Sequence, residues 1–98
     1  MQINYSKEAG RLTAAPNERL DSSTAPEFEK DMAIRLEDVS ELVLDMTGVE
    51  YVSSAGLRVI LKLQKIMCKR GGMKLIGVNE TVMDILELTG FSDILKIE

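Results

Sequence analysis

Hydrophobic and polar positions alternate near the start of the chain, and this pattern predicts a β-hairpin. Residues 2–6 alternate with the period of two expected for a half-buried strand, and residues 11–15 form a second strand after a turn at Glu8-Ala9-Gly10. Residues 42–46 and 73–77 are short apolar runs that predict two further strands. We expect the first of these two strands to be buried on both faces of a sheet.

Apolar residues with helical spacing follow the hairpin. Phe28, Met32 and Leu36 recur at every fourth position, which places them on the inner face of one helix. Asp21-Ser22-Ser23-Thr24 supplies several candidate N-caps, and Thr24 and Glu27 have the spacing of a capping box. We expect the helix to follow these residues and to end near residue 36 or 37.

Two more helices are predicted farther along the chain. The second covers residues 55–70, where basic and apolar side chains occupy opposite sides, and Gly71-Gly72 ends it. The third begins after Asn79 as N-cap and ends at Gly90. The side chains of these helices that we expect to face the core are Val59, Ile60, Leu63, Ile66, Met67, Val82, Met83, Leu86 and Leu88.

This order of elements predicts the fold class. Strands that are separated by helices run parallel through right-handed crossovers, so the fold is α/β with a mixed, mostly parallel sheet. We expect four to five strands covered by three or more helices, with residues 94–97 as a small edge strand or a packed tail. A chain of 98 residues supplies one core, so residues 1–98 form a single domain.

The composition excludes several kinds of chemistry. The chain has no histidine and one cysteine, so it lacks the usual proton shuttle and the ligands of a zinc cluster. It also lacks a Gly-rich phosphate-binding motif. We therefore expect no enzymatic activity, no metal and no cofactor, and we expect Cys68 to be packed against its neighbours.

Charge and hydropathy limit the cellular location and the kinds of partner that we expect for this chain. The net charge is −4, and two Tyr, two Phe and no Trp offer few rings for base stacking, so nucleic acid is not an expected partner. No apolar run approaches the roughly 20 residues of a membrane span, and the N-terminus lacks the layout of a signal peptide. We expect a cytoplasmic protein that does not bind a membrane.

Small hydroxyl residues stand where the third predicted strand gives way to the second helix. Asp45 and Thr47-Gly48 mark the end of the strand, and Ser53 and Ser54 lie at or beside the helix N-terminus. Unpaired N–H groups and the positive end of the helix dipole favour an added anion there. Hydroxyls before a helix are most often plain N-caps, so these residues alone leave both a capping and a modifiable serine open.

Four separated motifs resemble the STAS domain of bacterial anti-sigma factor antagonists, in the order of that family. They are RLDSSTA at residues 19–25, LDMTGVEYVSSAGL at residues 44–57, RGGMKL at residues 70–75 and LELTGF at residues 86–91. The resemblance covers nearly the whole chain and implies the STAS fold. Within the central motif, Ser53 stands where many members have Asp, and Ala55 stands where a second hydroxyl is common. Before the first motif, Glu18 replaces a frequent Gly.

The resemblance implies a switch that works by exchange of protein partners. In this family the unphosphorylated antagonist binds an anti-sigma factor that is also a serine kinase, and a sigma factor is thereby released. The kinase phosphorylates a serine at the start of the helix after the third strand, and a PP2C-like phosphatase reverses the modification. Alignment on Gly56-Leu57 places the phosphoacceptor at Ser54, and Asp21 is similar to the aspartate beside that serine. The resemblance also implies a monomer when the protein is free. The implied partner-binding residues are Asp21, Ser22, Ser53, Ala55, Gly56, Arg58 and Lys62.

Other functions remain open at this point. The chain is alternatively a STAS scaffold or a transport-complex subunit in which Ser54 is never modified. A nucleotide hydrolase is disfavoured, because histidine and a phosphate loop are absent from the sequence. Arg58, Lys62, Lys65 and Lys69 form a narrow basic stripe on the second helix, which is either a solvated face or a docking surface.

Overall fold

The predicted hairpin is present in the computed structural model, which describes residues 2–98. Strand β1 (Ile3–Glu8) pairs antiparallel with β2 (Arg11–Pro16), and both are longer than the sequence pattern predicts. Ala9 and Gly10 connect them with φ angles of 50° and 85°, the left-handed pair that a two-residue type I′ turn requires. Pro16 is the last residue of β2 and lies beyond Ala14, where the pairing of β2 with β3 stops, so its missing N–H interrupts no bond between these two strands.

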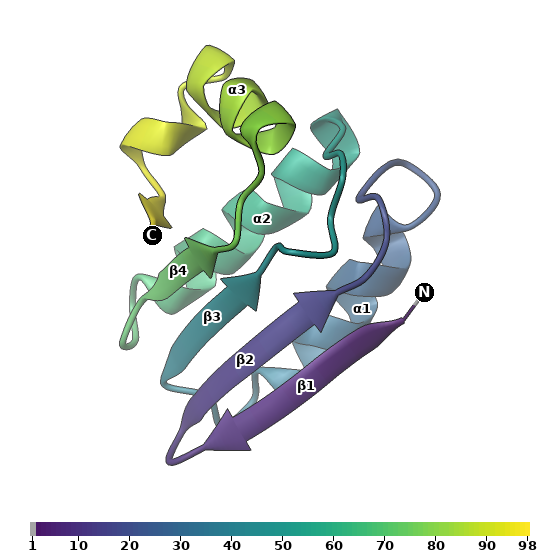
Figure 1. The fold of residues 1–98 in the computed structure, drawn as a ribbon. Coiled ribbons are helices and arrows are strands. Elements are labelled where there is room, and N and C mark those ends of the chain that lie inside the picture. The colour runs from purple at the N-terminus through teal and green to yellow at the C-terminus, as the bar shows by residue number, and fades with distance from the viewer. Residues whose placement is uncertain (1) are drawn as a thin grey trace.

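The other strands join the sheet in chain order. Strands β3 (Glu41–Asp45), β4 (Met73–Ile76) and β5 (Lys96–Ile97) run parallel to β2, which gives the order β1-β2-β3-β4-β5 (Figure 1). The prediction of a mixed, mostly parallel sheet is therefore confirmed. The C-terminal residues form an edge strand rather than a packed tail, after a short 3-10 helix at Phe91–Asp93 that the sequence pattern did not predict.

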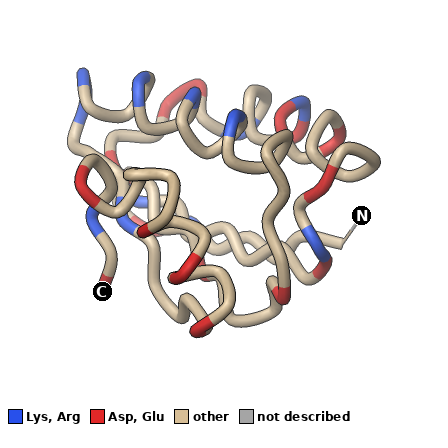
Figure 2. Tube along the Cα trace, turned by 90° about the horizontal axis from the view of Figure 1, so that it is seen from above, with Lys and Arg blue, Asp and Glu red and all other residues tan. Residues whose placement is uncertain are grey.

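The three predicted helices are present. Helices α1 (Ala25–Arg35) and α2 (Ser54–Met67) lie on the same side of the sheet, as Figure 1 and the view from above in Figure 2 show. Helix α3 (Glu80–Leu88) lies beyond the C-terminal end of β4. As predicted, Asn79 caps α3, because its Oδ1 accepts a hydrogen bond of 2.7 Å from the backbone N–H of Val82.

The core fills the space between the sheet and these helices. Leu42 and Leu44 point from β3 toward the helices and are at most 1% exposed, as are Phe28 and Met32 of α1. Val43 lies on the opposite face of β3 and is still only 6% exposed, so the expected burial of this strand on both faces is confirmed.

Three predictions of burial are wrong, and all three residues lie at helix ends. Ile66 in the last turn of α2 is 41% exposed, and Leu88 at the end of α3 is 87% exposed. Cys68 follows α2 directly as its C-cap and is also exposed. Helical periodicity shows which residues share a face, but burial requires a neighbouring element beside that turn of the helix.

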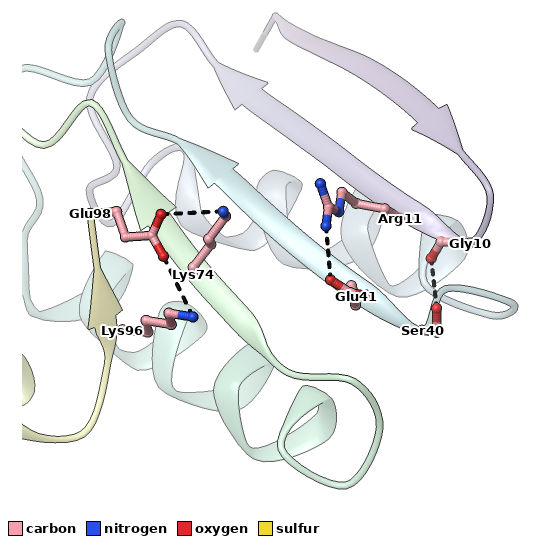
Figure 3. A network of polar contacts seen from close by, with 7 residues as sticks. All are labelled: Gly10, Arg11, Ser40, Glu41, Lys74, Lys96 and Glu98. Atoms are coloured by element: carbon pink, nitrogen blue, oxygen red, sulfur yellow. Dashed lines mark hydrogen bonds and ion pairs between the residues drawn. The ribbon is translucent and has the colours of Figure 1, made fainter.

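The sheet face that is turned away from α1 and α2 carries charged residues from neighbouring strands. Arg11 donates to Glu41 across β2 and β3 at 3.3 Å, and Glu98 contacts Lys74 and Lys96 at 3.3 and 3.5 Å (Figure 3). Such exposed pairs typically contribute about 0 to 1 kcal/mol each, so they keep this face polar more than they stabilise the fold.

Candidate functional site

Two segments that precede helices are joined next to the predicted serine site. Leu20 and Val52 form an isolated parallel bridge, and their side chains are 0% and 1% exposed. The N–H of Leu20 donates to the carbonyl of Tyr51 at 3.0 Å, and the N–H of Ser53 donates to the carbonyl of Leu20 at 2.8 Å. We call these paired residues, 19–21 and 51–53, the loop ladder. The loop ladder holds the start of α1 beside the start of α2.

Gly56 allows α2 to approach the loop ladder closely. A Cβ at this position would lie 2.5 Å from the carbonyl oxygen of Leu20 and 2.9 Å from both Leu20 Cβ and Val52 Cγ1. These distances are shorter than van der Waals contact, so any side chain here would push the first turn of α2 away from Leu20. The predicted site residue Gly56 is buried and serves the close approach of the two segments.

Asp21 starts the turn that leads into α1. Its Oδ1 accepts hydrogen bonds from Ser23 N–H at 2.9 Å, Ser23 Oγ at 2.7 Å and Thr24 N–H at 3.2 Å. Bonds from Ser23, followed by smaller effects that include the positive charge of Arg19, lower the pKa of Asp21 below its ordinary value of 3.8. Asp21 is therefore a carboxylate at neutral pH.

The hydroxyl of Thr24 does not have the capping role predicted for it. It makes no side-chain cap bond to α1, and instead accepts from the N–H of Asp21 at 3.0 Å and donates to the carbonyl of Arg19. The side chains of Asp21 and Thr24 thus accept from each other's backbone N–H groups. This is the reciprocal pattern of a capping box, formed by residues 21 and 24 in place of the predicted residues 24 and 27. The carboxylate that takes part in this pattern therefore belongs to Asp21, a residue of the loop ladder.

The two serines at the start of α2 have different surroundings. Ser53 is the N-cap with extended backbone, and its Oγ is buried without a hydrogen-bond partner among residues 2–98. Ser54 is the first residue of α2, and its side chain is exposed. The first turn of α2 contains no acidic residue, so the positive end of the helix dipole has no carboxylate of its own helix beside it. An anion on Ser54 would be electrostatically favoured and accessible to a partner.

A groove of about 330 Å³ adjoins Ser54 between α1 and α2. Its lining includes the predicted site residues Ser22, Ala55, Arg58 and Lys62. Lys62 forms an ion pair of 2.8 Å with Glu29 across the groove. The basic stripe described from the sequence lies exposed along α2 and is visible as a row of blue segments in Figure 2.

The structure therefore gathers most of the predicted site residues around Ser54. Asp21 and Ser53 belong to the loop ladder, while the groove residues lie just beyond it. Gly56 and the Oγ of Ser53 lie beneath the surface. Sequence reasoning missed Arg19 and Tyr51, which flank the buried Leu20 and Val52 and place the Arg19 guanidinium 5.0 Å from the centre of the Tyr51 ring. Their alternation with the apolar Leu20 and Val52 could have placed each of them on the surface, but it could not have shown that they lie together.

Comparison with known proteins gives consistent results. The model of the STAS domain family matches residues 3–98. The anti-sigma-B factor antagonist of Listeria monocytogenes is 30% identical over 81% of this chain and 71% of its own length. BtrV of Bordetella bronchiseptica, a candidate anti-sigma factor antagonist, is 29% identical over 99% of this chain and 85% of its own length.

A solved structure is similar over almost the whole chain. A candidate anti-sigma factor antagonist from Thermotoga maritima superposes with a TM-score of 0.88 at 27% identity, over 97% of this chain and 84% of that protein. Among residues 2–98, no helix has both the length and the apolar character needed to cross a bilayer.

Proposed function

This chain belongs to the STAS domain family, and on that premise we propose that it is an anti-sigma factor antagonist controlled by phosphorylation of Ser54. The unphosphorylated form binds an anti-sigma factor that is also a serine kinase, and the bound anti-sigma factor releases its sigma factor. A PP2C-like phosphatase restores the active form. The names of the relatives from Listeria and Bordetella support the first part of this proposal.

The observation that carries the assignment of Ser54 is its position. Ser54 is exposed at the start of α2, between the carboxylate of Asp21 on the loop ladder and the groove that contains Arg58. In the proposed reaction Ser54 Oγ attacks the γ-phosphorus of ATP held by the kinase. The Oγ–P bond forms, the bond to ADP breaks, and the hydroxyl proton leaves to a base. Ser54 is the substrate of this reaction, and the catalytic groups belong to the kinase.

The free energies of adding a charge at a helix N-terminus and of burying it under a partner explain why such a modification would act on binding and leave the fold intact. A phosphate adds a charge of about −1.5 to −2, and at a helix N-terminus a negative charge is favourable by about 0.3 to 1 kcal/mol. Arg58 lies one turn after Ser54, where its guanidinium is in reach of a phosphate on the serine. Burying the same charge unpaired under a partner would cost several kcal/mol, and each 1.4 kcal/mol is about a tenfold change in affinity.

The partner surface that we propose includes both sides of Ser54. Asp21, Ser22 and Ser53 contribute from the loop ladder and the turn after it, and Ala55, Arg58 and Lys62 contribute from the groove. Gly56 contributes indirectly, because it lets the two sides come together.

The test uses the purified anti-sigma factor kinase from the same organism. After incubation with ATP, we expect intact mass and peptide mapping to locate one phosphate on Ser54, and Ser54→Ala to remain unmodified. Ser53→Ala is the matched control for the site of modification, since it removes the neighbouring hydroxyl and should still carry its phosphate on Ser54. Calorimetry should then show the phosphorylated protein binding the kinase at least tenfold more weakly than the unmodified protein. Phosphate that persists in Ser54→Ala, or equal affinities of the two forms, would contradict the proposal.

A further inference from the structure

Arg19 and Tyr51 form an exposed stack at the beginning of the loop ladder. Leu20 and Val52 point into the core, so their neighbours on either side point outward. On the outward side the Arg19 guanidinium covers one part of the Tyr51 ring at 5.0 Å, and Tyr51 is 37% exposed. Apart from this ring contact and the attraction to Asp21, the Arg19 side chain has no described partner within residues 2–98.

The stack borders a hollow, because Arg19 is one of the residues that line it. The hollow has a volume of about 300 Å³ and is lined by Asn17, Glu18, Arg19, Gly48 and Glu50. Its lining residues come before the Leu20–Val52 bridge in both segments of the chain, whereas the residues that line the α1–α2 groove come after it. Glu18 and Glu50 make this rim acidic, in contrast to the basic stripe of α2.

We propose that Arg19 and Tyr51 anchor the anti-sigma factor on this chain, an inference that rests on the proposed function. An apolar side chain of the anti-sigma factor packs on the part of the Tyr51 ring that Arg19 leaves open, and basic residues of the same protein pair with Glu18 and Glu50. Arg19 acts as a positioning residue that holds the ring in place. Tyr and Arg are enriched among the few interface residues that carry most of the binding energy.

The area that an interface needs supports this extension of the docking surface. A standard interface covers about 800 Å² on each partner, or about one seventh of the 5576 Å² surface of this chain. The α1–α2 groove on its own is a small part of such an area. The loop ladder links the hollow beside the Arg19–Tyr51 stack to the α1–α2 groove, because both segments lead from one lining to the other, so one partner can cover the stack, Ser54 and Lys62 together.

The experiment measures binding of the unphosphorylated chain to the purified anti-sigma factor kinase by calorimetry. We expect Tyr51→Ala to weaken binding at least tenfold and Arg19→Ala to weaken it severalfold, while Tyr51→Phe keeps the ring and binds within about threefold of wild type. Circular dichroism of each variant verifies that it is folded.

Arg35→Ala is a matched control. It removes a stack of the same kind, in which the Arg35 guanidinium carbon lies 3.9 Å from the centre of the Tyr5 ring. This stack is at the end of α1 that is far from the loop ladder. This variant should bind like wild type, so a loss of affinity here as large as that of Arg19→Ala would overturn the inference.

Failure of the inference and failure of the proposed function have different signatures. If wild type binds the kinase and is phosphorylated on Ser54 while folded Tyr51→Ala binds within twofold of wild type, the anchor is overturned and the proposed function stands. If wild type neither binds the kinase nor is phosphorylated by it, both are overturned. If Tyr51→Ala loses binding but is still phosphorylated on Ser54 at high kinase concentration, the anchor is supported as a docking element separate from the phosphoacceptor.

Discussion

Replacing Gly56 by Ala tests whether close packing or helix propensity decides the stability of the site. Ala is favoured over Gly in a helix interior by about 0.8 to 1 kcal/mol, so propensity alone predicts a more stable protein. The added Cβ must however retreat from the Leu20 carbonyl oxygen, from 2.5 Å to the 3.4 Å at which ordinary contact begins, about 0.9 Å. That carbonyl is held by the N–H of Ser53 and cannot turn aside without breaking the loop ladder.

Steric cost should exceed the gain in propensity. Overpacking in a well-packed core typically costs about 1 to 3 kcal/mol, and we expect the upper half of this range because the clash is with a backbone carbonyl that is held in place. After subtraction of the gain in propensity, Gly56→Ala should lose about 1 to 2 kcal/mol of stability. In a domain of this size each kcal/mol lowers Tm by about 4 to 8 °C. The chain has no Trp, so the measurement is urea unfolding followed by far-ultraviolet circular dichroism.

A neighbouring substitution separates the two effects. Ala55→Gly changes propensity at the adjacent position without adding an atom, and we expect it to cost about 0.5 to 1 kcal/mol. If Gly56→Ala proves as stable as wild type or more so, the steric reasoning is refuted. Phosphorylation of Gly56→Ala by the kinase should also be slower, because the first turn of α2 would be displaced from Asp21.

Three further predictions concern charged residues near the two helices. Asp21→Asn should be less stable than wild type at neutral pH, because a carboxylate with a lowered pKa stabilises the fold only while it is ionised. The difference in stability should shrink as the pH falls below 3.8 and through the lowered pKa of Asp21. Urea unfolding at several pH values measures this difference, and a constant difference would refute the prediction. Arg70→Met removes hydrogen bonds to the backbone carbonyls of Leu36 and Val39, which follow α1, and should lower the free energy of unfolding by about 1 to 2 kcal/mol. The control Lys69→Met changes an exposed side chain and should alter the free energy of unfolding by less than about 0.5 kcal/mol. Charge reversal at Lys62 and Lys65 should slow association with the anti-sigma factor kinase and flatten its dependence on salt in stopped-flow measurements, and unchanged kinetics would mean that the basic stripe is only a solvated face.

Most of the fold could be predicted from local patterns. The hairpin, the alternation of helices and strands, and the cap at Asn79 each depend on residues close together in sequence, so periodicity and capping rules were sufficient. The exposure of Ile66, Leu88 and Cys68 depends on which elements lie beside a helix end, and no local pattern contains that information.

The site was predicted only in part for the same reason. Ser54 and Asp21 were found because a motif places them, but the bridge between Leu20 and Val52 joins residues more than a helix apart in sequence. Only that bridge reveals that Arg19 and Tyr51 lie together, and only the distance from Leu20 explains the glycine at position 56.

The order of the strands has a consequence for how quickly the chain reaches its native state. Leu12 pairs with Leu42 and Leu42 pairs with Met73, so each of these two parallel pairings closes a loop that holds a single helix. The entropy lost in closing a loop grows only with the logarithm of its length, and no strand here must wait for a distant partner. Folding should therefore begin at the hairpin or at any one strand-helix-strand unit and spread to its neighbours, at rates between those of helical bundles and β-sandwiches.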